Sequence, residues 1–384
     1  MIIGGGIIGS SIARELAYAT NASIAVIEKE SQVGMHASGR NSGVIHSGFN
    51  LKPGSTKARM CVEGSRKLRD YCREHKVDMD ETGTIVAASD SDEVAVLEEL
   101  LQRGIENEVP GIEMITREQL RQKEQYSAGI AALYSPTGAV VDSAQLLNSI
   151  VEDSKKQGVT YIMNSKVKEI DGDNIITTNR TIKAKHIINC AGLYADKIAH
   201  MIGIGNAYSV IPFRGEYFEV ARDCVNSMIY QPPNLEFPFL SIHLTRETDG
   251  RILAGPSAVL SLGRESYDKQ INCKETAQML LSTNFLLLAT HPEFLKMAYQ
   301  NFKTSLTKKA FLEQVRSLVP DIRAEDLTPS RSGIRAQMVE RNGKLVDDIL
   351  VIYSENSTHV LNTVSPGMTC SLAFAEHIVR KISE

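Results

Sequence analysis

The sequence predicts an α/β fold in which a Rossmann-like domain is interleaved with an α+β domain built on a mixed sheet. Three observations carry this prediction. A glycine-rich strand-to-helix turn opens the chain, and alternating strand and helix patterns return from Asp142 and again near the C-terminus. The segments between them are richer in paired strand patterns. The chain must therefore pass between the two domains more than once.

The chain of 384 residues is longer than one comfortable core, which agrees with two domains. We assign residues 1–82, 142–212 and 331–384 to the Rossmann-like domain, and residues 83–141 and 213–330 to the other domain.

The net charge of −4 and the isoelectric point near 6.2 provide no basic surface for nucleic acid. The six cysteines show neither C-x-x-C nor metal-ligand spacing, so we expect no metal site and a reducing compartment.

The first element is a glycine motif at residues 4–9, which read GGGIIG directly after Met-Ile-Ile. Gly4, Gly6 and Gly9 match G-x-G-x-x-G. In such a motif the first glycine permits the tight turn, the second allows close approach of a pyrophosphate, and the third allows close helix–strand packing. The helix expected at residues 8–19 then points its N–H groups at the phosphates. The backbone expected to contact them comprises Gly4, Gly6, Ile7, Ile8 and Gly9.

A second strand is expected at residues 23–27, and Glu28 at its end can accept hydrogen bonds from ribose hydroxyls. Strand, helix, second strand and acid in register predict a dinucleotide site rather than a purely structural turn. The loop that follows, residues 29–43, is dense in Gly, Ser, Asn and Arg, which suits a segment wrapped along an extended cofactor. This favours FAD over NAD. The cofactor contacts expected from this region are Lys29, Ser38, Arg40, Asn41, Ser42, Gly43, Val44 and Ile45.

The next elements alternate between the two domains. A helix at 55–74 is followed by a strand at 83–88, a helix at 92–108, a helix that Thr116 and Gln119 open as a capping box, and a hairpin at 131–141. From Asp142 we expect a helix at 143–157, a strand at 160–163 and a strand at 185–190 that ends in Ala191-Gly192. Backbone at that strand end, together with Val167, is assigned to the cofactor.

Residues 213–330 show strand patterns at 217–220, 239–244 and 251–255, and then helices up to Val319. Strands at 332–340, 350–351 and 360–361 return the chain to the cofactor domain, and a last helix is expected at 370–382. The turn before this helix can stabilise negative charge on the flavin pyrimidine. The residues assigned to the cofactor here are Gly333, Arg335, Pro366, Gly367, Met368 and Thr369.

Several strings resemble one family. Residues 37–48 read ASGRNSGVIHSG, with KPGS at 52–55, and they resemble the L-2-hydroxyglutarate dehydrogenase/oxidase family of D-amino-acid oxidase-like FAD-dependent oxidoreductases. Similar strings are FRGEY at 213–217, FPFL at 237–240, RSGIRAQ at 331–337, LVDD at 345–348 and SPGMT at 365–369. The resemblance implies oxidation of a 2-hydroxy acid, L-2-hydroxyglutarate to 2-oxoglutarate, by hydride transfer to flavin N5.

This chemistry needs a base for the substrate hydroxyl and a cation for its carboxylate. His46 is the candidate base, because imidazole titrates in the right range and small residues flank it. The alternative is a histidine packed on the flavin or covalently linked to it. Arg335 is the candidate carboxylate clamp, with a surface salt bridge as the alternative. Arg214, Tyr217 and His243 are expected to line the same pocket.

Other functions stay open at this point. An FAD-dependent glycerol-3-phosphate dehydrogenase or an amine or amino-acid oxidase would have the same fold, and a non-catalytic flavin-binding interaction protein is a more remote alternative. Oxygen, a quinone or a carrier protein could accept the electrons. The lysine-containing apolar stretches at 285–289 and 294–311 predict either a membrane-surface contact or core-facing helices. With no signal peptide expected, we predict a cytoplasmic protein, with peripheral contact at the inner face of the membrane as the alternative.

Overall fold

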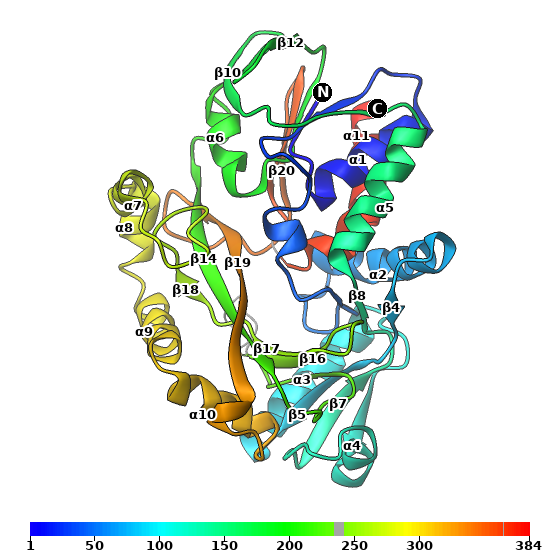
Figure 1. Cartoon of the computed structure of the whole chain (residues 1–384), viewed down its shortest axis with the longest axis vertical. Coiled ribbons are helices and arrows are strands. Elements are labelled where there is room, and N and C mark those ends of the chain that lie inside the picture. The colour runs from blue at the N-terminus through cyan, green and yellow to red at the C-terminus, as the bar shows by residue number, and fades with distance from the viewer. Residues whose placement is uncertain (234–241, 364) are drawn as a thin grey trace.

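The computed structural model describes residues 1–233, 242–363 and 365–384, and it has a mixed α/β fold (Figure 1). One layer is a six-stranded sheet in the order β20-β21-β13-β1-β2-β9. Its strands are parallel except for β20, which pairs antiparallel with β21. The bounds are β1 Ile2–Ile3, β2 Ala25–Ile27, β9 Thr160–Ile162, β13 Ile187–Asn189, β20 Leu350–Tyr353 and β21 Ser357–Asn362. This arrangement confirms the predicted Rossmann-like sheet.

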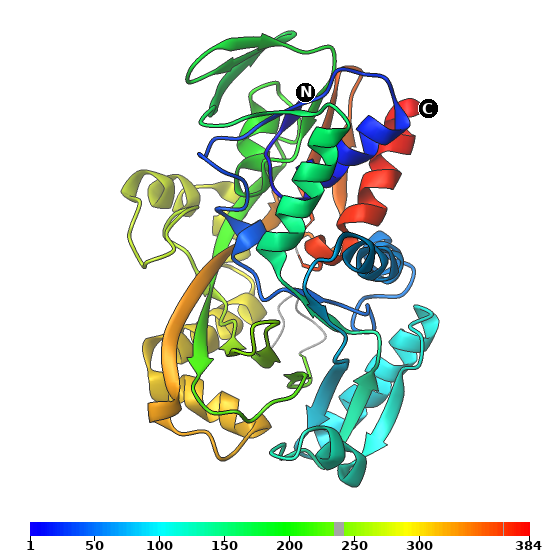
Figure 2. The same cartoon turned by 45° about the vertical axis from the view of Figure 1, so that its right-hand side comes forward.

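The two faces of this sheet are buried by different partners. Helix α1 (Ile7–Ala19) packs against α5 (Ser143–Lys156) and α11 (Gly367–Ser383), and these helices lie together beside the sheet in Figure 2. Because neighbouring strand residues point to opposite faces, Ile2 packs with residues of α1 and α11, whereas Ile3 packs with residues of a small antiparallel sheet. The strands of that small sheet are β10 Val167–Asp171, β11 Asn174–Thr177 and β12 Thr181–Lys183.

A second large sheet has the order β18-β14-β17-β16-β15-β5-β7-β6, and β19 pairs with β14. Its two longest strands, β14 (Tyr208–Val220) and β19 (Leu327–Glu340), pair antiparallel along most of their length. The other strands are β5 Thr84–Ala88, β6 Glu113–Thr116, β7 Ala131–Ser135, β15 Met228–Tyr230, β16 His243–Arg246, β17 Ile252–Gly255 and β18 Val259–Leu260. The expected domain boundaries at residues 212/213 and 330/331 fall inside β14 and β19. Each of these two strands therefore begins in one expected domain and ends in the other.

The predicted hairpin at residues 131–141 is wrong. Strand β7 pairs with β5 and β6, whereas β8 (Ala139–Val141) pairs with β3 (Val44–Ile45) and β4 (Met79–Asp80) in a separate sheet. The turn around Pro136 therefore passes the chain from one sheet to another. Turn residues between two apolar runs indicate a change of direction, but they do not identify the pairing partner of each strand.

The remaining helices frame these sheets. They are α2 Thr56–His75, α3 Ser91–Glu106, α4 Arg117–Lys123, α6 Ala195–His200, α7 Cys273–Leu280, α8 Thr283–Leu288, α9 Pro292–Leu306 and α10 Lys308–Leu318. Thr116 and Gln119 form the predicted capping box at the start of α4. All six cysteines are free thiols. The FPFL string at 237–240 and the start of the strand expected at 239–244 lie outside the described residues.

The turn between β1 and α1 explains the opening glycines. Gly4 has φ +107°, and a Cβ on it would lie 2.4 Å from the Cys190 carbonyl oxygen. A Cβ on Gly9 would lie 2.0 Å from the Gly4 carbonyl oxygen, which is fixed backbone. Helix α1 can thus approach its strand only because position 9 has no side chain.

We expect Gly9→Ala to lower the free energy of unfolding by about 1–3 kcal/mol, since the methyl group must push α1 away from β1. The flavin content of the purified protein should fall with it. Gly172→Ala is the control for a substitution without a steric clash: its Cβ would meet no atom within 4 Å, and although its φ of +55° strains an alanine backbone, the flavin content should not change. Urea unfolding and the visible spectrum of both variants test this, and full flavin content in Gly9→Ala would contradict it.

Candidate active site

A cavity of about 490 Å³ opens between the two large sheets. One end meets the carboxyl ends of β1, β2 and β13, at Gly4, Glu28 and Ala191. At the other end, side chains of the second sheet line the cavity together with His46. Ligands in parallel α/β sheets bind outside the carboxyl ends of the strands, and this cavity begins there.

Backbone forms much of the wall at the strand ends. A Cβ on Gly6 would lie 2.9 Å from the Ser38 hydroxyl, so the turn and the loop approach each other closely. The Ile7 N–H, in the first turn of α1, donates to Ser38 Oγ at 2.9 Å. The N-cap residue, Gly6, has no side chain that could cap the other N–H groups of this turn. The start of α1 therefore offers N–H groups and a positive dipole end to an anion in the cavity.

Glu28 ends β2 with its carboxylate held in place. Its Oε2 accepts from the Gly5 N–H at 2.9 Å, and its Oε1 accepts from the Glu30 N–H at 3.0 Å. A carboxylate has about four acceptor positions, so lone pairs remain for a ribose. Glu28 lines the cavity beside Lys29, as a dinucleotide site requires.

The loop after β2 connects the two ends of the cavity. Ser38, Arg40, Asn41, Ser42 and Val44 line it in turn. The start of α11 closes the same wall, where Thr369 Oγ1 accepts from the His46 N–H at 3.0 Å. The cavity-lining residues that precede Thr369 here are Pro366, Gly367 and Met368.

Arg335, Tyr217, His46 and His243 line the far end of the cavity. Arg335 lies on β19 opposite Phe213 of β14. Burial lowers the pKa of the Arg335 guanidinium from its usual value, but an arginine remains charged at physiological pH. Burial raises the pKa of Tyr217 above its ordinary value, so its hydroxyl keeps its proton at neutral pH.

Both histidines at this end are held neutral. Burial lowers the pKa of His46 to about 4, and the positive charge of Arg335 adds to the effect. Burial lowers the pKa of His243 to about 3, with smaller contributions from His46 and Arg335. The His243 ring stacks on Tyr230 at 4.5 Å between centroids, and its Nδ1 lies 2.8 Å from Thr245 Oγ1. Its orientation is therefore fixed by both neighbours.

The described residues fit an extended flavin dinucleotide. At one end lie the glycine turn, the N-terminus of α1 and Glu28, which can bind a ribose. At the other end lies the buried pocket formed by Arg335, Tyr217, His46 and His243. The chain matches the model of the FAD dependent oxidoreductase family over residues 1–381. The chain belongs to this family.

Known relatives extend along the whole chain. A protein of Indibacter alkaliphilus named L-2-hydroxyglutarate dehydrogenase is 38% identical, with 97% of this chain and 96% of the relative covered. The mitochondrial L-2-hydroxyglutarate dehydrogenase of Homo sapiens is 33% identical, with coverages of 100% and 88%. L-α-glycerophosphate oxidase from Mycoplasma pneumoniae, solved with FAD bound, shares the fold with a TM-score of 0.79 at 22% identity, covering 100% of this chain and 94% of that chain. The protein is thus an FAD-dependent oxidoreductase.

Four of the site residues predicted from the sequence lie in the described part of the chain but do not line the cavity of this FAD-dependent oxidoreductase. Gly9 acts through helix packing, and Gly43 allows close contact with the Val141 carbonyl oxygen. Ile45 is fully buried in a hydrophobic core. Arg214 is turned away from the pocket: its guanidinium donates to the Ser266 carbonyl oxygen at 3.3 Å and pairs with Glu216. The other predicted residues all line the cavity, and these include Val167, Gly192 and Gly333.

Other lining residues were not predicted. One group of them surrounds Tyr194, whose ring lies 5.5–5.7 Å from the ammonium groups of Lys29, Lys166 and Lys197. The unpredicted members of this group are Ser165, Lys166, Tyr194, Lys197, Ile198, Met201 and Glu275. They come from three separate segments without a local motif, so only the fold brings them together.

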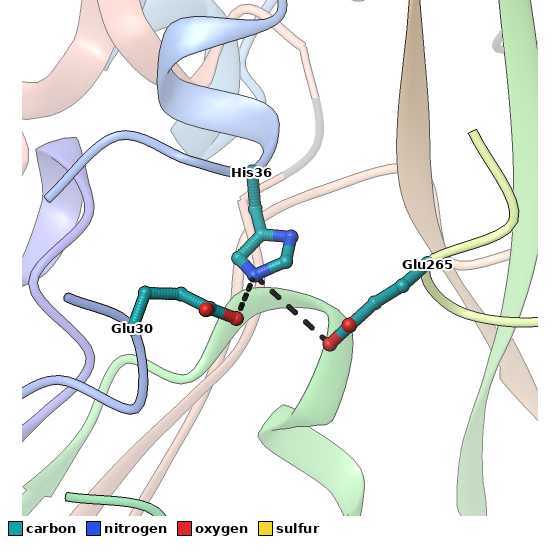
Figure 3. A group of neighbouring side chains, drawn as sticks. All are labelled: Glu30, His36 and Glu265. Carbon is teal, nitrogen blue, oxygen red and sulfur yellow. Dashed lines mark hydrogen bonds and ion pairs between the residues drawn. The ribbon is translucent and has the colours of Figure 1, made fainter. Parts of the chain in front are cut away.

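One group of potential metal ligands occurs among the described residues, at Glu30, His36 and Glu265 (Figure 3). The Lys29 ammonium already lies between these groups: its Nζ is 2.6 Å from His36 Nε2, 2.7 Å from Glu265 Oε1, and also contacts Glu30. A lysine ammonium supplies the positive charge that these acceptors need. The cluster is therefore an ion-pair network.

The pKa of His243 predicts a pH dependence of stability. Between pH 6.5 and about 3 the unfolded chain binds a proton at this ring that the folded protein excludes, so this contribution is fully present above pH 6.5 and is lost as the pH falls. We expect His243→Gln to reduce the slope of the free energy of unfolding against pH by up to about 1.4 kcal/mol per unit in this window. Urea unfolding at several pH values tests it. The difference at pH 8 gives the packing cost alone, and parallel profiles below pH 6.5 would contradict the prediction.

Proposed function

We propose that this enzyme oxidises L-2-hydroxyglutarate to 2-oxoglutarate. The observation that carries the proposal is the far end of the cavity, where one buried guanidinium lies beside two neutral imidazoles. A 2-hydroxy acid brings a carboxylate and a neighbouring hydroxyl, which match these two kinds of group. The names of the relatives, which are 31–38% identical over nearly the whole chain, support L-2-hydroxyglutarate as the specific acid.

In this proposal Arg335 holds the substrate carboxylate next to C2. Its planar fork can donate two parallel charge-assisted hydrogen bonds, and a low-dielectric surrounding strengthens both. The Tyr217 hydroxyl, which keeps its proton, is a further donor to the same anion. Together they fix the orientation of C2, and this positioning is a large part of the rate enhancement expected from bound reactants.

His46 acts as the base that removes the hydroxyl proton. A neutral imidazole is needed for this step, and burial keeps His46 neutral. A bound carboxylate would offset the positive charge of Arg335, which raises the pKa of His46 and makes the ring a stronger base when substrate is present. Bound FAD would supply the hydride acceptor for C2–H. The hydroxyl proton passes to His46, and the substrate becomes a 2-oxo acid.

We also propose that the two sets of segments expected from the sequence form an FAD-binding domain and a substrate-binding domain. The segments 1–82, 142–212 and 331–384 would bind FAD, and the segments 83–141 and 213–330 would complete the substrate pocket. The composition of the wall supports this division, since Gly4, Glu28 and Ala191 come from the first set and Tyr217 and His243 come from the second. Arg335 lies on the long β19, where the two sets meet.

We expect L-2-hydroxyglutarate to bleach the flavin absorbance of the purified protein under anaerobic conditions. The D enantiomer should be inactive, because carboxylate and hydroxyl cannot reach Arg335 and His46 together with C2–H facing the flavin. Glycerol 3-phosphate and glutamate serve as controls for the other chemistries of this fold. Bleaching by one of those compounds alone would overturn the substrate assignment and leave the cofactor assignment intact.

His46→Ala separates chemistry from binding in the same experiment. The variant should retain flavin, while the rate of its reduction falls by about 10²–10⁴-fold, the usual contribution of a general base. Retained flavin is the internal control for folding. A near-normal rate would remove His46 from the role of base.

A contact with a bilayer surface is a second part of the proposal. Among the described residues, seven of the thirteen exposed large apolar side chains fall between residues 271 and 299, on or beside α7, α8 and α9. They are Ile271, Leu280, Leu281, Leu286, Leu287, Leu295 and Tyr299. These helices lie on one side of the molecule in Figure 1. Inward-facing residues such as Phe294 are buried, so these helices have one face in the core, and the exposed apolar face supports the proposed membrane contact.

The charges around these apolar residues fit an anionic lipid surface. Lys274, Lys296 and Lys303 are exposed in the same helices. Apolar side chains that enter the headgroup region, flanked by lysines, are typical of peripheral membrane attachment. No helix among the described residues has the length and apolarity to cross a bilayer. Surface attachment at the inner face of the membrane would favour a lipid-soluble quinone over oxygen or a carrier protein as the electron acceptor.

We expect the protein to co-sediment with vesicles of phosphatidylcholine and phosphatidylglycerol, and less with phosphatidylcholine alone. A Leu281→Ser, Leu286→Ser double variant should weaken binding about tenfold, since two apolar side chains no longer leave water. Ile105→Ser is the matched control, because Ile105 is similarly exposed on α3. Equal binding of all three proteins, or no binding, would refute the membrane contact.

A further inference from the structure

The segment between β18 and α7, residues 261–272, reaches from the second sheet to the walls of the cofactor cavity. Four residues that line the FAD end of the cavity each contact Glu265 or Tyr267 of this segment, which do not themselves line the cavity. They are Lys29, His36, Arg40 and Tyr194. We propose that residues 261–272 form a clasp that retains FAD, with Glu265 and Tyr267 as its positioning residues.

The clasp has a rigid anchor. Arg264 donates to both carboxylate oxygens of Asp196, at 2.6 and 2.7 Å, and also contacts the Leu193 carbonyl oxygen. Arg264 and Asp196 are both buried. Breaking a buried pair of this kind is costly, because each partner would be left as an unpaired buried charge. The base of the clasp therefore stays attached to α6 when its other contacts open.

Glu265 braces two walls of the cavity at once. Its Oε1 accepts from the Lys29 ammonium at 2.7 Å and from the Tyr194 hydroxyl at 2.7 Å. Lys29 follows the ribose-binding acid of β2, and Tyr194 follows β13 on the opposite side of the FAD end. Figure 3 shows Glu265 and Glu30 pointing toward His36 from opposite sides. One carboxylate thus links two segments that must separate for a dinucleotide to leave.

Tyr267 holds the loop that covers the pyrophosphate region. Its hydroxyl lies 2.7 Å from His36 Nδ1, and its ring stacks on the Arg40 guanidinium at 4.1 Å from the centroid. Its own carbonyl oxygen accepts from Ser332 Oγ at 2.8 Å, which ties it to β19. His36 and Arg40 line the cavity, whereas Tyr267 does not, so Tyr267 supports these two side chains from outside the cavity wall.

The Arg264 anchor and the Glu265 contacts differ in solvent exposure. This difference allows the Glu265 contacts to break while the anchor stays in place. The Glu265 side chain is 39% exposed, whereas that of Arg264 is 10% exposed. Water and salt can compete with the Glu265 contacts without disturbing the anchor. The clasp therefore opens by loss of the Glu265 and Tyr267 contacts, and the rate of FAD release is set by this opening.

The test measures release of FAD from the holoenzyme, through the rise of flavin fluorescence after dilution. We expect Glu265→Ala to accelerate release about three- to tenfold, the range for a partly exposed pair with its hydrogen bonds. Glu325→Ala is the matched control, because Glu325 is an exposed, ion-paired glutamate outside the cavity wall. Equal release rates for the two variants would overturn the proposal.

Salt dependence distinguishes a clasp from a general loss of structure. Release from the unaltered enzyme should accelerate with added sodium chloride, whereas Glu265→Gln should release FAD faster at low salt and respond little to salt. Tyr267→Phe should lose only the His36 contact and act weakly, while Tyr267→Leu also loses the stack on Arg40 and acts strongly. An unchanged salt response in Glu265→Gln would refute the role of the carboxylate. Release does not involve the substrate, so these outcomes are independent of the proposed function.

Discussion

The antiparallel pairing of β14 with β19 is the constraint on which the rest of the site depends. This ladder places Phe213 opposite Arg335 and Gly215 opposite Gly333, and all four residues line the cavity. The ladder also contacts the cofactor loop directly, since a Cβ on Gly333 would lie 2.3 Å from the Arg40 carbonyl oxygen. A one-residue slip would turn Arg335 to the other face of the sheet. The register of this ladder thus fixes the position of the Arg335 charge relative to the loop that carries Arg40.

Local chemistry made part of this molecule predictable. The glycine motif, the acid after β2 and the capping box at Thr116 each involve residues a few positions apart, so their pattern determines their geometry. Long-range pairing is different. The strands around Pro136 read as a hairpin, yet the two join different sheets, because apolar partners elsewhere in the chain decide where each strand is buried.

The same limit applies to the site. Arg335 and Tyr217 could be identified because strong local strings surround them. Arg214 lies in such a string as well, but it serves the backbone of Ser266 and the carboxylate of Glu216. Tyr194 lies in no recognisable sequence motif. It lines the cavity because the chain turns there from β13 into α6. A residue type in a family string indicates a region, whereas the direction of its side chain depends on the register of the strand that carries it.

The distribution of charge along the cavity completes the argument for an acidic substrate. Among the described lining residues the carboxylates are Glu28 and Glu275, and neither lies at the end that Arg335 and the histidines form. Arg335 is buried at that end, and both imidazoles are kept neutral beside it. A cationic amine would add like charge to this end, which is unfavourable in a low-dielectric site. A carboxylate bound beside Arg335 would offset its positive charge and, by raising the pKa of His46, would strengthen the proposed base. Binding and proton transfer are thus coupled through one buried charge.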